Sequence, residues 1–255
     1  MREAGVVELL LTTQSAMWEA AQAAQYSRWL SASEQARLST MRSPARQQQF
    51  IACRYALRLL LARQRAGSVD QWTLDAPDGA APTVRSHPRN PSTEHARPPY
   101  LSLSHSGPYI ACAVANHAVG IDVEAAGRRK HRSSVQERAN IICSANERQH
   151  LLALDSVPAQ ETYLTQLWCM KESWFKQTGT GVDFAAIRHL ECAPEHALSQ
   201  PGTLRGNVRL WTSPTNKPGA FVLSLCSEVP VEGAALINQT GIRLCDGVGN
   251  RLLER

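Results

Sequence analysis

Apolar positions recur at helical spacing in the first quarter of the chain. Ser31-Ala32-Ser33-Glu34 has the spacing of a capping box and predicts the start of a short helix. Ser43-Pro44 predicts the cap and first residue of a longer helix that runs to about Arg65. At 100° per residue, Arg54, Arg58 and Arg65 share one narrow face of that helix. The opposite, core-facing side is predicted to carry Phe50, Leu57, Leu60 and Leu61.

The pattern changes to strand-like runs in the middle of the chain. Residues 75–99 hold six prolines and predict a long loop. Three short apolar or alternating runs then predict a β meander over residues 100–104, 109–115 and 119–124. Helices are predicted next, one opened by the capping box Ser144-Ala145-Asn146-Glu147 and a longer one from about Pro158 to Thr178, before Gly179. Apolar runs at 208–211 and 220–226 predict further strands, and the tail from about residue 228 gives no clear prediction.

This order of elements predicts an α+β protein with two comparable halves. The break falls near residues 116–119, so we expect an N-terminal half of residues 1–117 and a C-terminal half of residues 118–255. A chain of 255 residues is long enough to bury a core in either one large domain or two small ones.

Composition indicates a globular protein of a reducing compartment. No apolar run approaches the length of a membrane span, and the first residues do not resemble a signal peptide. The seven cysteines are widely spaced and form no Cys-x-x-Cys pair, so free thiols are expected rather than zinc or disulfides. We therefore expect a cytoplasmic protein that does not bind membranes.

The net charge of +5 is unevenly distributed. Eight arginines lie between Arg28 and Arg65 against one acid, Glu34, and a second basic cluster consists of Arg128, Arg129, Lys130 and Arg132. Such clusters are either solvated faces or sites for an anionic ligand, an acidic protein partner or nucleic acid. Aromatic residues make up only 6% of the chain and are not interleaved with the basic ones, which argues against nucleic-acid binding.

Two short motifs about fifty residues apart contain acidic side chains. Asp122 and Glu124 are two apart on a predicted strand, so both side chains leave the same face and suit the oxygen shell of Mg²⁺. Glu172 and Lys176 are four apart on a predicted helix and could be a surface ion pair. Trp168 and Phe175, however, would flank Glu172 and partly desolvate it, so that it needs a cation partner.

The segment Ser102-Leu103-Ser104-His105-Ser106 ends a predicted strand at a turn. Nothing around Ser104 resembles the Gly-x-Ser-x-Gly elbow of a nucleophile. The hydroxyls and the imidazole could instead donate hydrogen bonds to phosphate oxygens.

These motifs, in this order, resemble the Sfp-type 4′-phosphopantetheinyl transferases. The family is marked by Ser-His, then Gly-(Ile/Val)-Asp-x-Glu, then Trp-x-x-Lys-Glu-(Ala/Ser)-x-x-Lys. Here the matching residues are Ser104-His105, Gly120 to Glu124 and Trp168 to Lys176. The resemblance spans roughly residues 30 to 185. It implies a pseudo-dimer of two similar half-domains with coenzyme A in the cleft between them, and a monomeric enzyme.

The resemblance also implies a reaction and the residues that perform it. The phosphopantetheine arm of coenzyme A moves to a serine of an apo acyl or peptidyl carrier protein, and adenosine 3′,5′-bisphosphate is released. Asp122, Glu124 and Glu172 would bind Mg²⁺, and Glu172, directly or through a metal-bound water, would be the base. Lys176 would stabilise the transferring phosphoryl group or the leaving bisphosphate. The implied coenzyme A contacts are Arg37, Arg46, Arg54, Ser104, His105, Lys171 and Lys176.

One departure from the family pattern concerns a phosphate contact. Many members carry Gly-Lys-Pro before the Ser-His strand, whereas this chain has Ala80-Ala81-Pro82. Arg85 is a possible substitute for the missing lysine.

Some alternatives stay open from the sequence. The basic helix, starting near Arg46, suits the 3′-phosphate of coenzyme A, and the cluster at 128–132 could steer an acidic carrier protein. A Mg²⁺-dependent phosphodiester hydrolase could use the same carboxylates without a carrier, and the carrier itself is not identified.

Overall fold

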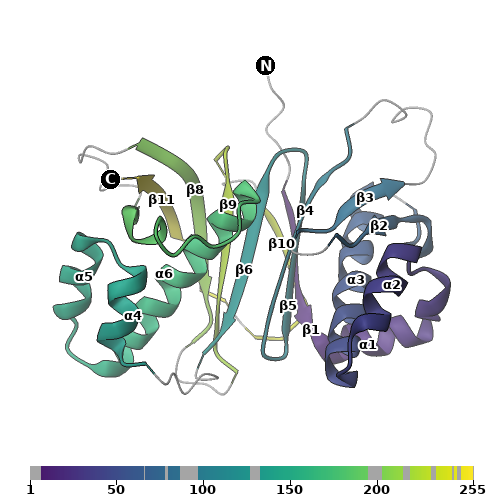
Figure 1. The fold of residues 1–255 in the computed structure, drawn as a ribbon, viewed down its shortest axis with the longest axis horizontal. Helices are drawn as coiled ribbons and strands as arrows, with labels where there is room; N and C mark the ends of the chain where they lie inside the picture. Colours follow the sequence, from purple (N-terminus) through teal and green to yellow (C-terminus); the bar gives the residue numbers. More distant parts are fainter. Residues whose placement is uncertain are drawn as a thin grey trace. The chain divides into compact units, whose positions relative to one another are not determined.

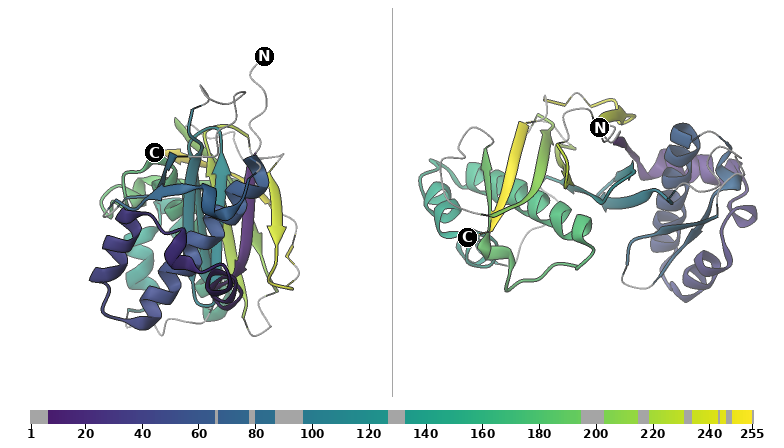
Figure 2. Two further views of the ribbon diagram at one scale, coloured as in Figure 1. Left: turned by 90° about the vertical axis from the view of Figure 1, so that its right-hand side faces the viewer. Right: turned by 90° about the horizontal axis from the view of Figure 1, so that it is seen from above.

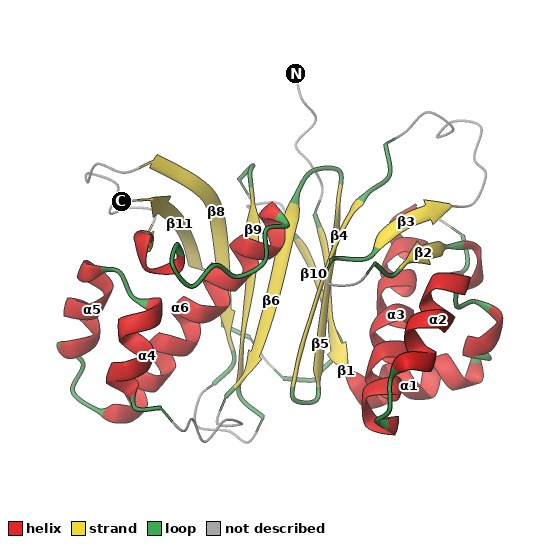
Figure 3. Cartoon of the chain, in the orientation of Figure 1, coloured by secondary structure: helices red, strands yellow, loops and turns green. Residues whose placement is uncertain are grey.

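The chain divides into two units, and each contains a β-sheet with helices. In the computed structural model the first unit comprises Met1–Val119 and Gly233–Gly241, and the second Gly120–Glu232 and Ile242–Arg255. The structure describes residues 7–65, 67–77, 80–86, 97–126, 133–194, 203–214, 219–230, 234–242, 244–245 and 248–254. Runs of helices and runs of strands follow one another along the chain, so the predicted α+β class is confirmed (Figure 3).

The first unit is built on a four-stranded sheet of order β10-β1-β5-β4. Its elements are β1 (Glu8–Thr13), α1 (Gln14–Ala23), α2 (Ala32–Thr40), α3 (Pro44–Arg65), β2 (Thr73–Asp75), β3 (Thr83–Ser86), β4 (Tyr100–Ser106), β5 (Tyr109–Ala115) and β10 (Ala235–Asn238). Strand β5 is antiparallel to both β1 and β4, whereas β10 is parallel to β1. Helices α1 and α3 pack together beside this sheet (Figure 1).

Part of the predicted long loop is a hairpin. Strands β2 and β3 pair antiparallel, with Leu74 opposite Val84, although the prolines of this stretch predicted no regular structure. Both side chains are buried in the core beneath α3, so the burial of two apolar residues outweighs the local turn-forming composition.

The arginine face of α3 is also not what the helical pattern predicted. Arg58 is fully buried and donates to both carboxylate oxygens of Glu34 on α2, at 2.9 and 2.5 Å. Arg54 lies beside the same carboxylate at 3.8 Å and is almost as buried. The predicted separation of the two faces is wrong, because Leu61 lies only about 20° around the helix from Arg54. The carboxylate of Glu34 supplies the charge that lets both arginines lie in the interior.

The second unit is built on a five-stranded sheet of order β6-β9-β8-β11-β7. Its elements are β6 (Val119–Ala125), whose first residue belongs to the first unit, α4 (Val135–Ile142), α5 (Ala145–Leu152), α6 (Val157–Thr178), β7 (Leu190–Pro194), β8 (Thr203–Thr212), β9 (Phe221–Ser227) and β11 (Val248–Glu254). Short 3-10 helices occur at Tyr26–Arg28 and Val69–Gln71 in the first unit and at Ile187–His189 in the second. Helices α4 and α5 pack on α6, and α6 packs on β9 and β8 (Figures 1 and 2).

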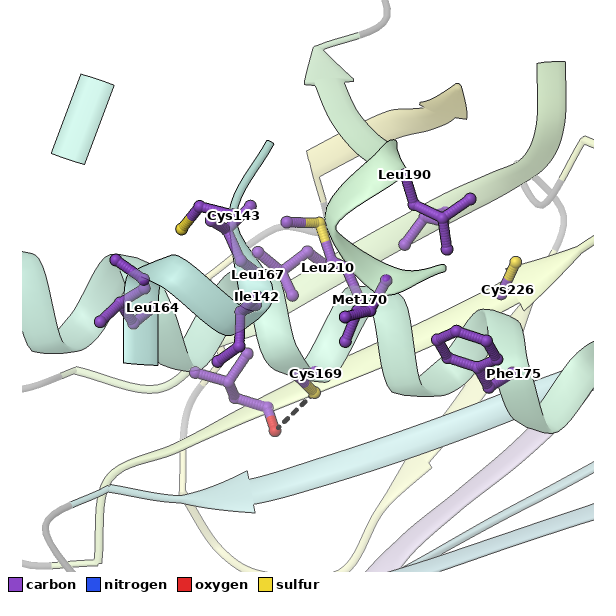
Figure 4. Packing of buried hydrophobic residues seen from close by; sticks show 14 of the residues in the cluster. Ile142, Cys143, Leu164, Leu167, Cys169, Met170, Phe175, Leu190, Leu210 and Cys226 are labelled. Carbon is purple, nitrogen blue, oxygen red and sulfur yellow. Dashed lines mark hydrogen bonds between the residues drawn. The ribbon is translucent and has the colours of Figure 1, made fainter. Parts of the chain in front are cut away.

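The predicted ends of α6 are confirmed. Ser156 caps its first turn, and Gly179 ends it with a φ of 71°, a left-handed conformation that favours glycine. Apolar residues of α6, including Leu164, Leu167, Met170 and Phe175, pack against Ile142, Leu190 and Leu210 (Figure 4). This core fixes which face of α6 remains available for polar side chains.

Candidate metal centre

Gly120 lets strand β6 pass close to helix α6. A Cβ atom at this position would lie 1.8 Å from the backbone oxygen of Ser173 and 2.5 Å from the backbone nitrogen of Gln177. No side chain fits in that space, so only glycine allows this crossing. The glycine of the Gly-Ile-Asp-Val-Glu motif therefore brings the next residues of β6 beside α6.

The alternation of side chains along strand β6 determines the face to which its two carboxylates point. Ile121 and Val123 are buried, and Asp122 and Glu124 point to the other face. Asp122 is only 1% exposed, whereas Glu124 is half-buried. A carboxylate as buried as Asp122 needs a cation close by.

Helix α6 supplies the third carboxylate and a lysine. One oxygen atom from each of Asp122, Glu124 and Glu172 lies within 4.8 Å of the others. Lys176 lies one helical turn beyond Glu172, and its Nζ atom is 2.6 Å from Oδ1 of Asp122 and 3.4 Å from Oε1 of Glu172. The structure thus brings together the three predicted metal ligands and the predicted lysine.

The charges around Lys176 hold it protonated. Burial alone would lower the pKa of the ammonium group, but the carboxylates of Asp122 and Glu172 and the hydrogen bond to Asp122 together raise it above its ordinary value. The ammonium balances part of the negative charge of the three carboxylates. A divalent cation would balance more of it.

The donor set fits a hard divalent cation. All three ligands are carboxylates, whose oxygen atoms suit Mg²⁺, and Mg²⁺ typically completes its shell with water and phosphate oxygens. Among the residues that the structure describes, no other group of three histidine, cysteine or acidic side chains has this arrangement. We refer to Asp122, Glu124 and Glu172 as the acidic triad.

Two further groups of α6 contact β6, the strand that carries two members of the triad. The indole Nε1 of Trp168 donates a 3.0 Å hydrogen bond to Oε1 of Glu124. The thiol of Cys169 donates to the backbone oxygen of Asp122 at 3.4 Å and to that of Val222 at 3.7 Å, the latter drawn in Figure 4. The sequence pattern indicated neither contact, since both join residues more than forty positions apart.

Lys171, predicted to contact coenzyme A, lies in the interior of the second unit. It is 0% exposed, and its ammonium donates to Glu147 Oε2 at 2.6 Å and to the backbone oxygens of Ile142 and Ile187 at 2.7 and 3.2 Å. An ammonium group has three donors, and these contacts use all of them. Its environment favours a structural role over the predicted one.

The predicted phosphate contacts of the first unit differ in exposure. On β4, Ser104 is buried and His105 is exposed. Arg46 is exposed on α3, and Arg37 donates to the backbone oxygen of Pro77 at 2.8 Å. Arg85 is paired with Asp75 at 3.6 Å on the surface. The cluster Arg128, Arg129, Lys130 and Arg132 lies outside the described residues.

Arg54 combines burial with unused donors. Its guanidinium lies over the ring of Phe50, 4.9 Å from the centroid, and its Nε and Nη1 atoms have no hydrogen-bond partner among the described residues. Burial and the charges of Arg37 and Arg58 lower its pKa, although Glu34 and Cys53 act in the opposite direction. Buried donors without acceptors are costly, so an anion would be a favourable neighbour.

The candidate metal centre lies in a part of the chain that is similar to known proteins. Residues 118–226, which contain the acidic triad and Lys176, match the family model of the 4′-phosphopantetheinyl transferase superfamily. The resemblance noted in the sequence motifs is therefore confirmed over this part of the chain.

Individual relatives carry the same name. The chain is 37% identical over 83 residues to the 4′-phosphopantetheinyl transferase Sfp of Bacillus subtilis, covering 32% of this chain and 34% of that protein. It is 32% identical over 130 residues to the 4′-phosphopantetheinyl transferase psf-1 of Bacillus pumilus, covering 50% of this chain and 48% of that protein. The chain thus aligns with no more than about half the length of these two relatives.

Proposed function

We propose that the protein transfers the 4′-phosphopantetheine arm of coenzyme A to a serine hydroxyl of an apo acyl or peptidyl carrier protein and releases adenosine 3′,5′-bisphosphate. The observation that carries this proposal is the acidic triad with Lys176 beside it, in the part of the chain that matches the transferase superfamily. Phosphoryl transfer depends mainly on positioning and on neutralising charge, and this arrangement is suited to both.

The triad would hold Mg²⁺ on the pyrophosphate of coenzyme A, where the ion would neutralise charge on the phosphate oxygens. Glu172 is half-buried and can accept the proton of the carrier serine. The serine oxygen then forms a bond to the phosphorus of the phosphopantetheine arm as the bond from that phosphorus to the bridging oxygen breaks. The leaving bisphosphate keeps that oxygen, and the Lys176 ammonium stabilises its charge.

The first unit would supply further contacts to coenzyme A. Arg54 is the preferred residue for a phosphate group, ahead of Arg46 and Arg37, because it has buried donors that find no acceptor within the described part of the chain. Ser104 and His105 remain proposed phosphate contacts. We further propose the pseudo-dimeric arrangement with coenzyme A between the two halves, as the family resemblance implies.

The cellular setting and assembly are also proposals. All seven cysteines are free thiols, which suits the cytoplasm, and within the described residues no helix has the length and apolar character that crossing a membrane requires. We expect an acidic carrier as partner and a monomeric enzyme, which light scattering would test.

A mass-shift assay on a panel of apo carrier proteins tests the reaction. We expect at least one carrier to gain the mass of the phosphopantetheine arm in the presence of coenzyme A and Mg²⁺. Glu172→Gln should abolish the gain. Glu161→Gln is the matched control, since Glu161 lies on the same helix but pairs with Arg138.

The same assay separates the alternative reaction. Consumption of coenzyme A at an equal rate without any carrier would indicate a phosphodiester hydrolase. A panel in which no carrier gains mass and no coenzyme A is consumed would contradict both.

A further inference from the structure

The side chain of Trp168 is held in a fixed orientation against Glu124. Its Nε1 atom donates a 3.0 Å hydrogen bond to Oε1 of Glu124, which lies 44 positions away on β6. The indole has one donor and no acceptor, so this is the single hydrogen bond that it can make. The direction of the ring therefore determines where that carboxylate oxygen is held.

The ring is supported from a second side. Phe184 stacks on Trp168 with ring centroids 6.4 Å apart and an angle of 19° between the planes. Trp168 also packs against the buried core that contains Leu164 and Leu167. An indole with a packed body and one directed donor restricts the rotation of the carboxylate it binds.

Helical spacing couples this donor to the triad. Trp168 lies four residues before Glu172, so both side chains leave the same face of α6. One helix therefore carries a member of the triad and, one turn earlier, the donor to a second member. Carboxylates have several lone pairs, so Glu124 can accept from the indole and still bind a cation.

We propose that Trp168 is a positioning residue that orients Glu124 for metal binding. This inference rests on the proposed function, because it requires that the triad hold a divalent cation. Outer-shell partners of metal ligands typically change metal affinity by about 10–100-fold when they are removed. The Trp168 side chain would act in this way through its N–H group and without touching the metal.

Mn²⁺ binding to the full chain, followed by electron paramagnetic resonance in the presence of coenzyme A, tests the proposal. Trp168→Phe removes the N–H group but keeps a ring for packing, and should weaken Mn²⁺ binding by about 10–100-fold. Phe184→Leu removes the stacked ring but leaves the N–H group, and should weaken binding by less than about threefold. In the transfer assay, Trp168→Phe should raise the Mg²⁺ concentration for half-maximal rate while the rate at saturating Mg²⁺ stays near that of the wild type.

A second variant, Trp168→His, separates the loss of the N–H group from a folding defect in Trp168→Phe. It retains a ring N–H and should recover part of the affinity for Mn²⁺. Unchanged Mn²⁺ affinity in Trp168→Phe, or an equal loss in Trp168→Phe and Phe184→Leu, would overturn the positioning role and leave the proposed function intact. If the wild type binds no Mn²⁺, or if binding survives Asp122→Asn, the metal centre itself fails and the positioning role fails with it.

Discussion

Lys176 donates a 2.6 Å hydrogen bond from its ammonium group to Oδ1 of Asp122, a residue 54 positions earlier on another element. The carboxylate is almost completely buried, and the ammonium is about one-quarter exposed. The lysine is thus a cation that balances buried negative charge on Asp122.

Replacing this lysine should destabilise the metal-free protein. Lys176→Met removes the ammonium that pairs with the buried carboxylate of Asp122, and because Lys176 is partly exposed we expect a loss of about 2 kcal/mol, below the 3–5 kcal/mol typical of fully buried pairs. Urea unfolding in the presence of EDTA measures this loss of unfolding free energy, and added Mg²⁺ should restore part of it. Arg188→Met removes an exposed cation of the same unit and should change stability by less than about 0.5 kcal/mol. Equal stability of Lys176→Met and wild type would show that Asp122 does not depend on the ammonium.

The same pair predicts a dependence on alkaline pH. The folded-state pKa of Lys176 is raised above its ordinary value of about 10.4, so its stabilising contribution is fully present below that value and is lost as pH rises through the folded pKa. The difference in unfolding free energy between wild type and Lys176→Met should therefore be constant from pH 7 to about 10 and shrink above it. A difference that shrinks between pH 7 and 9 would contradict the raised pKa.

The crossing at Gly120 predicts strong intolerance of any side chain. Gly120→Ala places a methyl group onto the backbone oxygen of Ser173, so β6 and α6 must separate. We expect a loss of more than about 3 kcal/mol in urea unfolding and of Mn²⁺ binding. Gly181→Ala is the matched control, since it has open space but a φ of 71°, and should cost about 1 kcal/mol from backbone strain alone. Similar losses of stability in both variants would show that the close approach of β6 to α6 does not cause the intolerance at position 120.

Lys171 and Glu147 should behave as a coupled structural pair. Lys171→Met leaves the Glu147 carboxylate buried with backbone donors from Ser144 and Cys192 but without its ammonium partner, and we expect a loss of about 3–5 kcal/mol. The double variant Lys171→Met/Glu147→Gln keeps a capping side chain at position 147 and should be more stable than Lys171→Met.

The double variant also tests the coenzyme A role first predicted for Lys171. If the lysine is structural, the KM for coenzyme A should stay within about twofold of the wild type, since no ligand contact is removed. A KM increase comparable to that of Lys176→Met would restore Lys171 to the binding site.

Thiol reactivity should distinguish one cysteine from the buried ones. Burial raises the pKa of Cys53 to about 12 and that of Cys143 to about 11, and burial together with the carboxylates of Asp122 and Glu124 raises that of Cys169 well above its usual range. Since the thiolate is the reactive form, iodoacetamide at pH 8 should modify exposed Cys245 first. Mass spectrometry of digests checks this, with urea-unfolded protein as the control in which all seven react. Early modification of Cys169 in the folded protein would contradict its burial.

The features that the sequence predicted well depend on neighbouring residues. The capping boxes at Ser31 and Ser144, the hairpin of β4 and β5, and the end of α6 at Gly179 each follow from side chains within a few positions. The predicted meander is wrong in its third strand, because β6 does not pair with β5 and lies instead at the edge of the other sheet, beside β9. Alternation on β6 and helical spacing on α6 likewise gave the correct faces for Asp122 and Glu172.

The features that it missed depend on distant partners. Helical spacing places Lys171 on the same face as buried Leu167 and Phe175, but nothing near it in the chain indicates a partner for its charge. The partners of Arg58 and Lys171, Glu34 and Glu147, come from other helices. The hydrogen bond from Trp168 to Glu124 requires the crossing at Gly120, which local patterns do not encode. Strand β10 is only four residues long, and its pairing depends on the edge of β1, which lies more than two hundred positions earlier in the chain.

The parallel pairing of β1 with β10 has a consequence for synthesis on the ribosome. Glu8 is among the first described residues, yet its neighbour in the sheet, Ala235, emerges only after almost the whole second unit has been made. Until then β1 keeps an open edge, which is a template for wrong pairing. The first unit is thus the first to begin folding, but it cannot finish until β10 has been made. A nascent chain stalled before residue 235 would be the form most in need of a chaperone.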